Sequence, residues 1–146
     1  MRIANRPVPR SRRRGAAAVE FAFVLPLLVL IVLGCIDFGR FAYTYIALNN
    51  AVRAGASYGI MNNYQPSTQG TWITGITTAA QQEMNGQIGY VTSNLTVQAP
   101  VVTVESSGLR NVQVTASYPF KTIVNWSGVP SSTINLTSSV TMRLIR

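Results

Sequence analysis

Apolar residues dominate one continuous stretch near the N-terminus. Residues 16–36 have the sequence AAAVEFAFVLPLLVLIVLGCI, in which Glu20 is the one charged side chain. A bilayer core is about 30 Å thick and needs about 20 apolar residues in a helix. Helices of soluble cores seldom stay apolar on every face for so long. The stretch therefore predicts a transmembrane helix over 16–36. Pro26, which lacks an amide hydrogen, predicts a kink inside it.

The helical pattern continues beyond the apolar stretch. Residues 37–60 contain no proline, and large apolar or aromatic side chains recur there at spacings of three and four, which places them on one stripe of a helix. This packing stripe consists of Phe38, Phe41, Tyr45, Leu48 and Val52. It can pack against the chain's own sheet, against a partner helix, or against both. Asp37 and Arg40, three residues apart, are expected to pair on the helix surface.

A second, short helix is expected over about 71–85. Apolar residues recur there at helical spacing, at Trp72, Ile73, Ile76, Ala80 and Met84. Gly86 lies just past the last of them, where a glycine often ends a helix. Gly75 and four threonines weaken this prediction, because glycine and β-branched residues are poor helix formers.

Beyond residue 90 the pattern changes to a period of two, which is typical of strands with one buried face. The apolar positions are Leu95, Val97, Val102 and Val104, then Val112, Val114, Ala116 and Tyr118, then Ile134, Leu136, Val140, Met142 and Leu144. Residues 106–108 predict a hairpin turn, and 119–133 are expected to form a partly buried connection. Three such strands predict an antiparallel sheet that the distal half of the long helix covers on one side. The predicted fold class is therefore α+β.

Charge is concentrated at the N-terminus. Six of the twelve basic residues precede Gly15, whereas the chain from Ala16 onward carries six basic and four acidic side chains. A basic block can be a nucleic-acid arm, but next to an apolar stretch it indicates a segment retained in the cytoplasm. We therefore expect a basic leader over 1–15, a helix over 16–60, an extracytoplasmic domain over 61–146, and no nucleic-acid partner.

The residue inventory argues against catalysis. The chain has no histidine, and Cys35 is its single cysteine, so no internal disulfide can form. Beyond the start of the apolar stretch the acidic residues are Asp37, Glu83 and Glu105. A histidine-based triad or a multi-ligand metal site cannot be built from this set. We expect no enzyme activity, no cofactor, no metal and no small-molecule substrate.

The most specific signal lies where the basic leader meets the apolar stretch. Gly15 follows three arginines, and Glu20 lies five residues after it. A carboxylate at the centre of a membrane helix costs about 2.5–3.5 kcal/mol, and less near its end, so its presence suggests a function. Cleavage after Gly15 would give Ala16 an α-amino group about one helical turn from Glu20. That cation could pair with Glu20 of a neighbouring chain and set the register between packed helices.

Further residues complete this pattern at 14–22, 25–27, 37–40 and 47–56. The first segment resembles the prepilin-peptidase site of type IV pilin-like proteins, in which a glycine precedes the cut and a glutamate is fifth after it. The continuation resembles the TadE-like pseudopilins of the Tad (tight adherence, Flp-type) pilus. The resemblance is strong over 13–59 and only general over 90–146. Phe21 departs from it mildly, since related fibre subunits often have tyrosine there.

The resemblance implies a pseudopilin or minor pilin of a surface-attachment or secretion fibre. Gly15 and Ala16 would flank the bond cut by a membrane prepilin peptidase, and Glu20 would serve processing and assembly. Other pilins or pseudopilins would be partners through the N-terminal helix. The protein would sit in the bacterial inner membrane, with its N-terminus cytoplasmic and its C-terminal domain periplasmic or extracellular.

Other interpretations remain open at this point. The apolar stretch can be an uncleaved anchor of an envelope-binding protein that never joins a fibre. Residues 32–35, Val-Leu-Gly-Cys, resemble a degenerate lipoprotein cleavage box, which would lead to acylation of Cys35. Lipoproteins usually continue with a flexible polar tether, whereas residues 36–52 continue an amphipathic helix.

Overall fold

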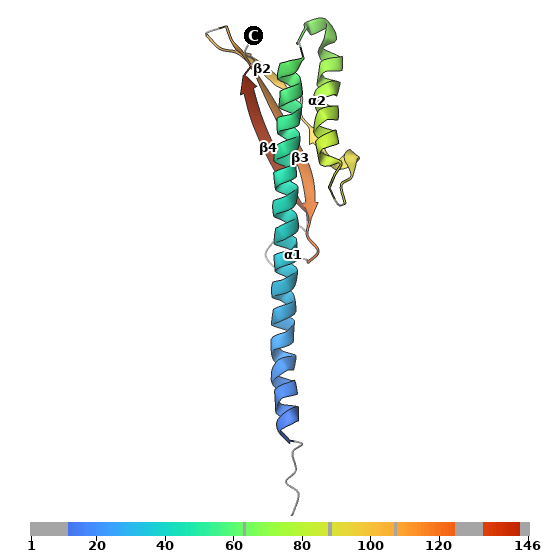
Figure 1. Cartoon of the computed structure of the whole chain (residues 1–146), viewed down its shortest axis with the longest axis vertical. Coiled ribbons are helices and arrows are strands. Elements are labelled where there is room, and N and C mark those ends of the chain that lie inside the picture. Colours follow the sequence, from blue (N-terminus) through green and yellow to red (C-terminus); the bar gives the residue numbers. More distant parts are fainter. Residues whose placement is uncertain (1–11, 63, 88, 107, 125–132, 144–146) are drawn as a thin grey trace, which may run out of the picture. The chain divides into compact units, whose positions relative to one another are not determined.

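The computed structural model describes residues 12–62, 64–87, 89–106, 108–124 and 133–143 (Figure 1). Its elements are α1 (Arg12–Met61), η1 (Pro66–Thr68), α2 (Gln69–Met84), η2 (Thr92–Asn94), β1 (Thr96–Val97), β2 (Val101–Val104), β3 (Arg110–Lys121) and β4 (Thr133–Arg143). The predicted α+β fold, with a long N-terminal helix and a small antiparallel sheet, is confirmed. The chain divides into two compact units inside α1, Met1–Ile36 and Asp37–Arg146.

The first unit, as far as it is described, is the helical segment 12–36 of α1. Its most apolar window has a mean hydropathy of 2.7, and none of that window is buried by protein. By length and composition the helix is able to cross a membrane. α1 includes Pro26 in its interior without ending there, and the kink expected at this proline stays a prediction. A helix that is apolar all round and uncovered by protein is suited to a lipid environment.

The second unit contains a sheet with β3 at its centre. β4 pairs antiparallel with one side of β3, from Lys121↔Thr133 to Asn111↔Arg143, and β1 and β2 pair with the other side. The sequence predicts one strand around Pro100, but the structure has two short strands that Pro100 separates. The reason is that proline has no amide hydrogen to donate to a sheet. The sheet therefore has four strands instead of three.

β3 also extends further than expected. Pro119 and Phe120 were placed in the connection 119–133, yet both belong to β3 and pair with Asn135 and Ile134 of β4. The Gln98 amide donates to the carbonyl of Thr115 at 2.9 Å, so odd-numbered residues of β3 point their backbone groups toward β1. The backbone nitrogen of Pro119 therefore points to the β1 side of β3, at a position beyond the end of β1. Proline has no amide hydrogen, but no strand on that side would accept one here, so no ladder hydrogen bond is lost. Residues 125–132 of the predicted connection, and Leu144 of the predicted last strand, lie outside the described residues.

The predicted hairpin turn is present between β2 and β3. Gly108 donates to the carbonyl of Glu105 at 2.9 Å, and Glu105 donates to the carbonyl of Leu109 at 2.8 Å. Gly108 has a φ of 80°, which glycine adopts without steric cost. Ser107 lies outside the described residues.

Residues 37–61 of α1 and the whole of α2 cover one face of the sheet (Figure 1). The buried core consists of Leu48, Ala51, Val52, Ala56, Trp72, Ile76, Ala80, Met84, Leu95, Val112, Val114, Ala116, Tyr118, Phe120 and Leu136. The opposite face is polar, and Thr115 and Gln113 reach Ser139 there by hydrogen bonds of 3.0 and 3.2 Å. The expected cover of the sheet by the distal half of the long helix is therefore confirmed.

The two helices of the second unit pack closely because small residues lie between them. A Cβ atom added at Gly55 would come within 3.2 Å of Ile76, and one added at Gly59 would come within 3.2 Å of Ile76 and Val112. The indole of Trp72 donates to the carbonyl of Gly59 at 3.2 Å. Gly55 and Gly59 thus allow α1 to approach α2 and β3 at the same time.

Gly75, which weakened the helix prediction for α2, is explained by Tyr58. A side chain at position 75 would overlap the ring of Tyr58, whereas Gly70 of the same helix has open space around its Cα. We expect Gly75→Ala to lower the free energy of unfolding by about 1–3 kcal/mol through this overlap. Gly70→Ala should be neutral or stabilise by up to about 1 kcal/mol. Denaturant unfolding of the full chain in detergent, followed by near-UV circular dichroism, compares the two. Equal midpoints for both variants would contradict the tight Tyr58 contact.

Candidate functional site

The predicted cleavage segment lies in the first turns of α1. Gly15, Ala16 and Glu20 are all exposed, and nothing lies within 4 Å of a Cβ added at Gly15. Because α1 is helical here, Ala16 and Glu20 lie four residues apart on the same face. Glu20 makes no hydrogen bond or ion pair within the described part of the chain, so its carboxylate is available to a partner. The leader residues 1–11 and the side chains of 12–14 lie outside the description.

The packing stripe predicted on α1 is divided between the core and the surface. Leu48 and Val52 are fully buried against the sheet. Phe41 is partly buried and meets Phe120 edge to face, with ring centroids 5.7 Å apart. By contrast, Phe38 is 72% exposed and Tyr45 is 43% exposed.

Asp37 explains why Phe38 faces outward. Asp37 is 5% exposed and takes the inward position at this turn. Successive residues of a helix are rotated by about 100°, so the next side chain points away from the sheet. Packing against the chain's own sheet thus accounts for Phe41, Leu48 and Val52, and leaves Phe38 and Tyr45 on the surface.

The Asp37 carboxylate holds the end of β3 to α1. Its two oxygens accept the amide of Ile123 at 2.9 and 3.1 Å, and one of them also accepts the amide of Val124 at 3.2 Å. The expected pair with Arg40 is present at 3.2 Å, but the side chain of Arg40 is 47% exposed whereas that of Asp37 is 6% exposed. Hydrogen bonds from amides to a carboxylate are stronger than neutral ones. The pair is predicted from the sequence but these amides are not, because nothing near Asp37 in the sequence indicates a partner 86 residues away.

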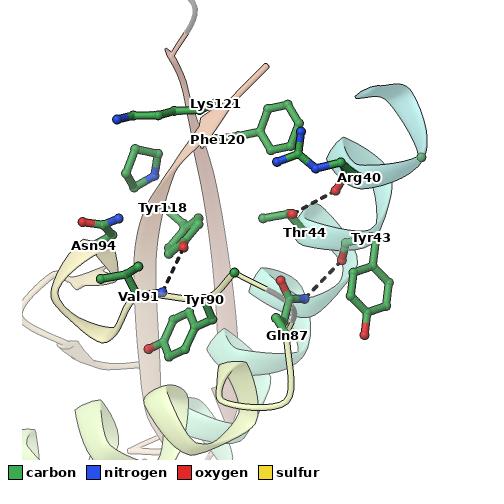
Figure 2. A pocket seen from close by; sticks show the side chains of 13 residues that line it. Arg40, Tyr43, Thr44, Gln87, Tyr90, Val91, Asn94, Tyr118, Phe120 and Lys121 are labelled. Carbon is green, nitrogen blue, oxygen red and sulfur yellow. Dashed lines mark hydrogen bonds between the residues drawn. The ribbon is translucent and has the colours of Figure 1, made fainter. Parts of the chain in front are cut away.

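A cavity of about 670 Å³ opens beside this link. Figure 2 shows residues that line it, which come from α1, from the segment after α2 and from the end of β3. They are Gly39, Arg40, Tyr43, Thr44, Gln87, Gly89, Tyr90, Val91, Asn94, Tyr118, Pro119, Phe120 and Lys121. Arg40 lies over the ring of Phe120, with its guanidinium carbon 5.4 Å from the ring centroid. The volume is within the range of small-molecule sites.

Several polar side chains on the cavity wall form hydrogen bonds within the protein. The hydroxyl of Tyr118 accepts the amide of Val91 at 3.3 Å, and Thr44 donates to the carbonyl of Arg40 at 2.8 Å (Figure 2). Gln87 donates to the carbonyl of Tyr43 at 3.4 Å. These bonds position the segment after α2 against α1 and β3, so they serve the fold.

Tyr90 stacks on Tyr118 in the same wall, with ring centroids 5.9 Å apart. Burial raises the pKa of the Tyr90 phenol above its usual value, the Thr92 hydroxyl acts in the opposite direction, and Tyr118 adds to the increase. The neutral phenol is therefore the form that the fold favours. The contribution of the neutral Tyr90 phenol to the free energy of unfolding is complete below about pH 10, the pKa of a free tyrosine. This contribution is lost as the pH rises through the pKa that Tyr90 has in the folded protein.

Metal-binding groups are scarce in the described ranges, which hold no cluster of three or more His, Cys, Asp or Glu residues able to bind an ion. Cys35 is exposed as a free thiol.

The family model of TadE-like proteins matches residues 15–57. The match covers the predicted cleavage segment, the apolar stretch and most of α1, and it confirms the resemblance found in the sequence. No curated protein and no solved structure gives a significant match to the chain.

Proposed function

We propose, because the chain is TadE-like over residues 15–57, that it is a pseudopilin or minor pilin that takes part in assembly of a Tad (Flp-type) pilus. A membrane prepilin peptidase would cut it after Gly15. The observation that carries this proposal is the combination, inside the matched segment, of Gly15, an exposed Glu20 and an uncovered apolar helix. The proposed role is structural and requires no catalysis by the chain itself.

The proposed mechanism is lateral packing of apolar helices. Residues 16–36 carry apolar side chains that no protein covers within the first unit, so neighbouring subunits or lipid must cover them. Cutting after Gly15 would place an α-amino group on Ala16, on the same helix face as Glu20. In a low-dielectric bundle this amine would pair with Glu20 of a neighbour, which fixes the stagger between helices.

The proposed location is the bacterial inner membrane, with the N-terminus cytoplasmic and the second unit outside. Basic residues are retained on the cytoplasmic side of a span, and they precede Gly15 in this chain. Asp37 follows directly on the apolar stretch. Its bonds to Ile123 and Val124 mean that the fold of the second unit begins at the residue after the apolar stretch.

The mature N-terminus tests the proposal. We expect mass spectrometry of the full chain, expressed in cells with an active prepilin peptidase, to find Ala16 as the first residue. Gly15→Leu should leave the leader attached, and Gly39→Ala, a glycine of the same helix with open space around it, should be cut normally. An intact leader on the unmodified chain would refute the proposed processing. An acylated Cys35 would establish the lipoprotein alternative instead.

A further inference from the structure

The dipeptide Asn85-Gly86 follows the last turn of α2 and is exposed to solvent. Both residues are exposed, and nothing lies within 4 Å of a Cβ added at Gly86. Asparagine is one of the thermolabile residues of proteins, because its side-chain carbonyl can react with the backbone. A following glycine favours this reaction, since it has no side chain to hinder the approach of the two groups.

The two groups that would react at this dipeptide are free of hydrogen bonds. The backbone amide of Asn85 donates to the carbonyl of Gln82 at 3.2 Å, but the Asn85 carboxamide makes no hydrogen bond within the described part of the chain. The amide of Gly86 likewise has no acceptor there, although the amides of Asn85 and Gln87 on either side of it are bonded. The Gly86 amide is therefore accessible to hydroxide, which must remove its proton before the nitrogen can attack.

The other asparagines that the structure describes lack this combination of free groups. Those whose carboxamide is held by a hydrogen bond are Asn49, Asn62 and Asn111. Those that lie within a helix or strand and precede a buried side chain are Asn50 and Asn135. Asn94 is exposed, but the next amide, of Leu95, donates to the carbonyl of Thr92 at 3.2 Å.

We infer that Asn85 converts spontaneously to isoaspartate through a cyclic imide. The deprotonated amide nitrogen of Gly86 attacks the Cγ carbon of Asn85, and the bond from Cγ to Nδ2 breaks with release of ammonia. Water then opens the imide ring. Opening at the former backbone carbonyl gives isoaspartate, in which the main chain runs through the former side chain, and opening at Cγ gives aspartate. Water is consumed and ammonia released, so the conversion needs no oxidant or reductant.

A local opening of the fold must precede ring closure. Asn85 has a helical ψ of −16°, and the backbone has to rotate away from this value to bring the Gly86 nitrogen onto Cγ. The rotation breaks the bond from the Gln87 amide to the carbonyl of Met84, which has a length of 3.1 Å. Because helix ends open at low cost compared with a core, this step leaves the buried residues of α2 in place.

Isoaspartate at position 85 would loosen the segment that follows. It adds a methylene group to the main chain between Met84 and Gln87, inside the turn that their hydrogen bond closes. The new carboxylate also lies at the C-terminal end of α2, where the helix dipole disfavours a negative charge. Gln87 further donates from its side chain to the carbonyl of Tyr43 at 3.4 Å (Figure 2). The modification is expected to release Gln87 from both carbonyls, whether or not the leader is cut.

Peptide mapping of the full chain in detergent, after incubation in mildly acidic or mildly alkaline buffer, tests the inference. Mass spectrometry locates the product, and enzymatic methylation distinguishes isoaspartate from aspartate. The peptide that contains Asn85 should acquire isoaspartate, and faster in the alkaline buffer because the Gly86 amide must lose its proton. The peptide that contains Asn94 should stay unchanged over the same time.

Two glycine variants provide a matched comparison. Gly86→Ala should reduce the product to the level seen at Asn94, and Gly70→Ala, at a position with equally open surroundings, should leave it unchanged. An unmodified Asn85 in the alkaline buffer, or equal conversion in Gly86→Ala, would overturn the inference. Hydrogen exchange of the converted chain should show a Gln87 amide that has lost its protection, and unchanged protection would overturn the expected loosening.

Discussion

Asp37→Ala is expected to lower the free energy of unfolding of the second unit by about 2–4 kcal/mol. The substitution removes the acceptor of the Ile123 and Val124 amides, whose hydrogen bonds to Asp37 are partly buried although Ile123 itself is 58% exposed. A buried donor left unsatisfied costs about 1–3 kcal/mol. It also releases the end of β3 from α1. Denaturant unfolding of the full chain in detergent, followed by tryptophan fluorescence, measures the change.

Two further variants separate the amides from the ion pair. Arg40→Ala removes the partner whose side chain is 47% exposed, and such pairs contribute only about 0–1 kcal/mol. Asp37→Asn keeps one acceptor oxygen and should fall between the other two variants. If Arg40→Ala destabilised the unit as much as Asp37→Ala, Arg40, through its ion pair or its contact with the Phe120 ring, and not the amides would hold this end of β3.

The sequence predicted the elements whose pattern is local. The apolar stretch and the spacing of Leu48 and Val52 predicted a helix to residue 60, and α1 ends at Met61. Alternation over residues 112–118 and 134–142 predicted β3 and β4. The cleavage segment was equally visible, because Gly15 and Glu20 lie five residues apart in a setting where a carboxylate is costly.

Features that depend on distant partners could not be predicted in the same way. Asp37 meets amides 86 and 87 residues away, and Gly75 is required by a ring from another helix. Pro119 looked like the end of a strand because its tolerance depends on where β1 stops. The packing stripe was predicted from spacing alone, which cannot show that Asp37 takes the inward position and turns Phe38 outward.

The position of β4 in the sheet is another feature that the sequence alone does not predict. Alternation shows that residues 133–143 form a strand, but only the sheet order shows that this strand lies at an edge. The strand carries no charge before its last residue, Arg143.

Glu20→Ala is expected to insert into the membrane normally and to fail in pilus assembly. Removing the carboxylate makes the apolar stretch more apolar, so insertion is not impaired. In the assembled bundle it would leave the Ala16 amine without its partner, and breaking a buried pair in this way costs about 3–5 kcal/mol, more than a hundredfold in an equilibrium constant. Membrane fractionation measures insertion, and electron microscopy of the cell surface measures piliation.

Pairing of the Ala16 amine with Glu20 also predicts how two variants behave when they are combined. Gly15→Leu keeps the leader, so no Ala16 amine forms, and it should cause the same assembly defect as Glu20→Ala. Because both variants remove one interaction, the double variant should be no worse than either single one. Glu83→Ala, which removes an exposed carboxylate of α2, should leave piliation unchanged. Normal piliation by Glu20→Ala would show that this carboxylate has no part in assembly, and a worse defect in the double variant would show that Glu20 acts on something other than the Ala16 amine.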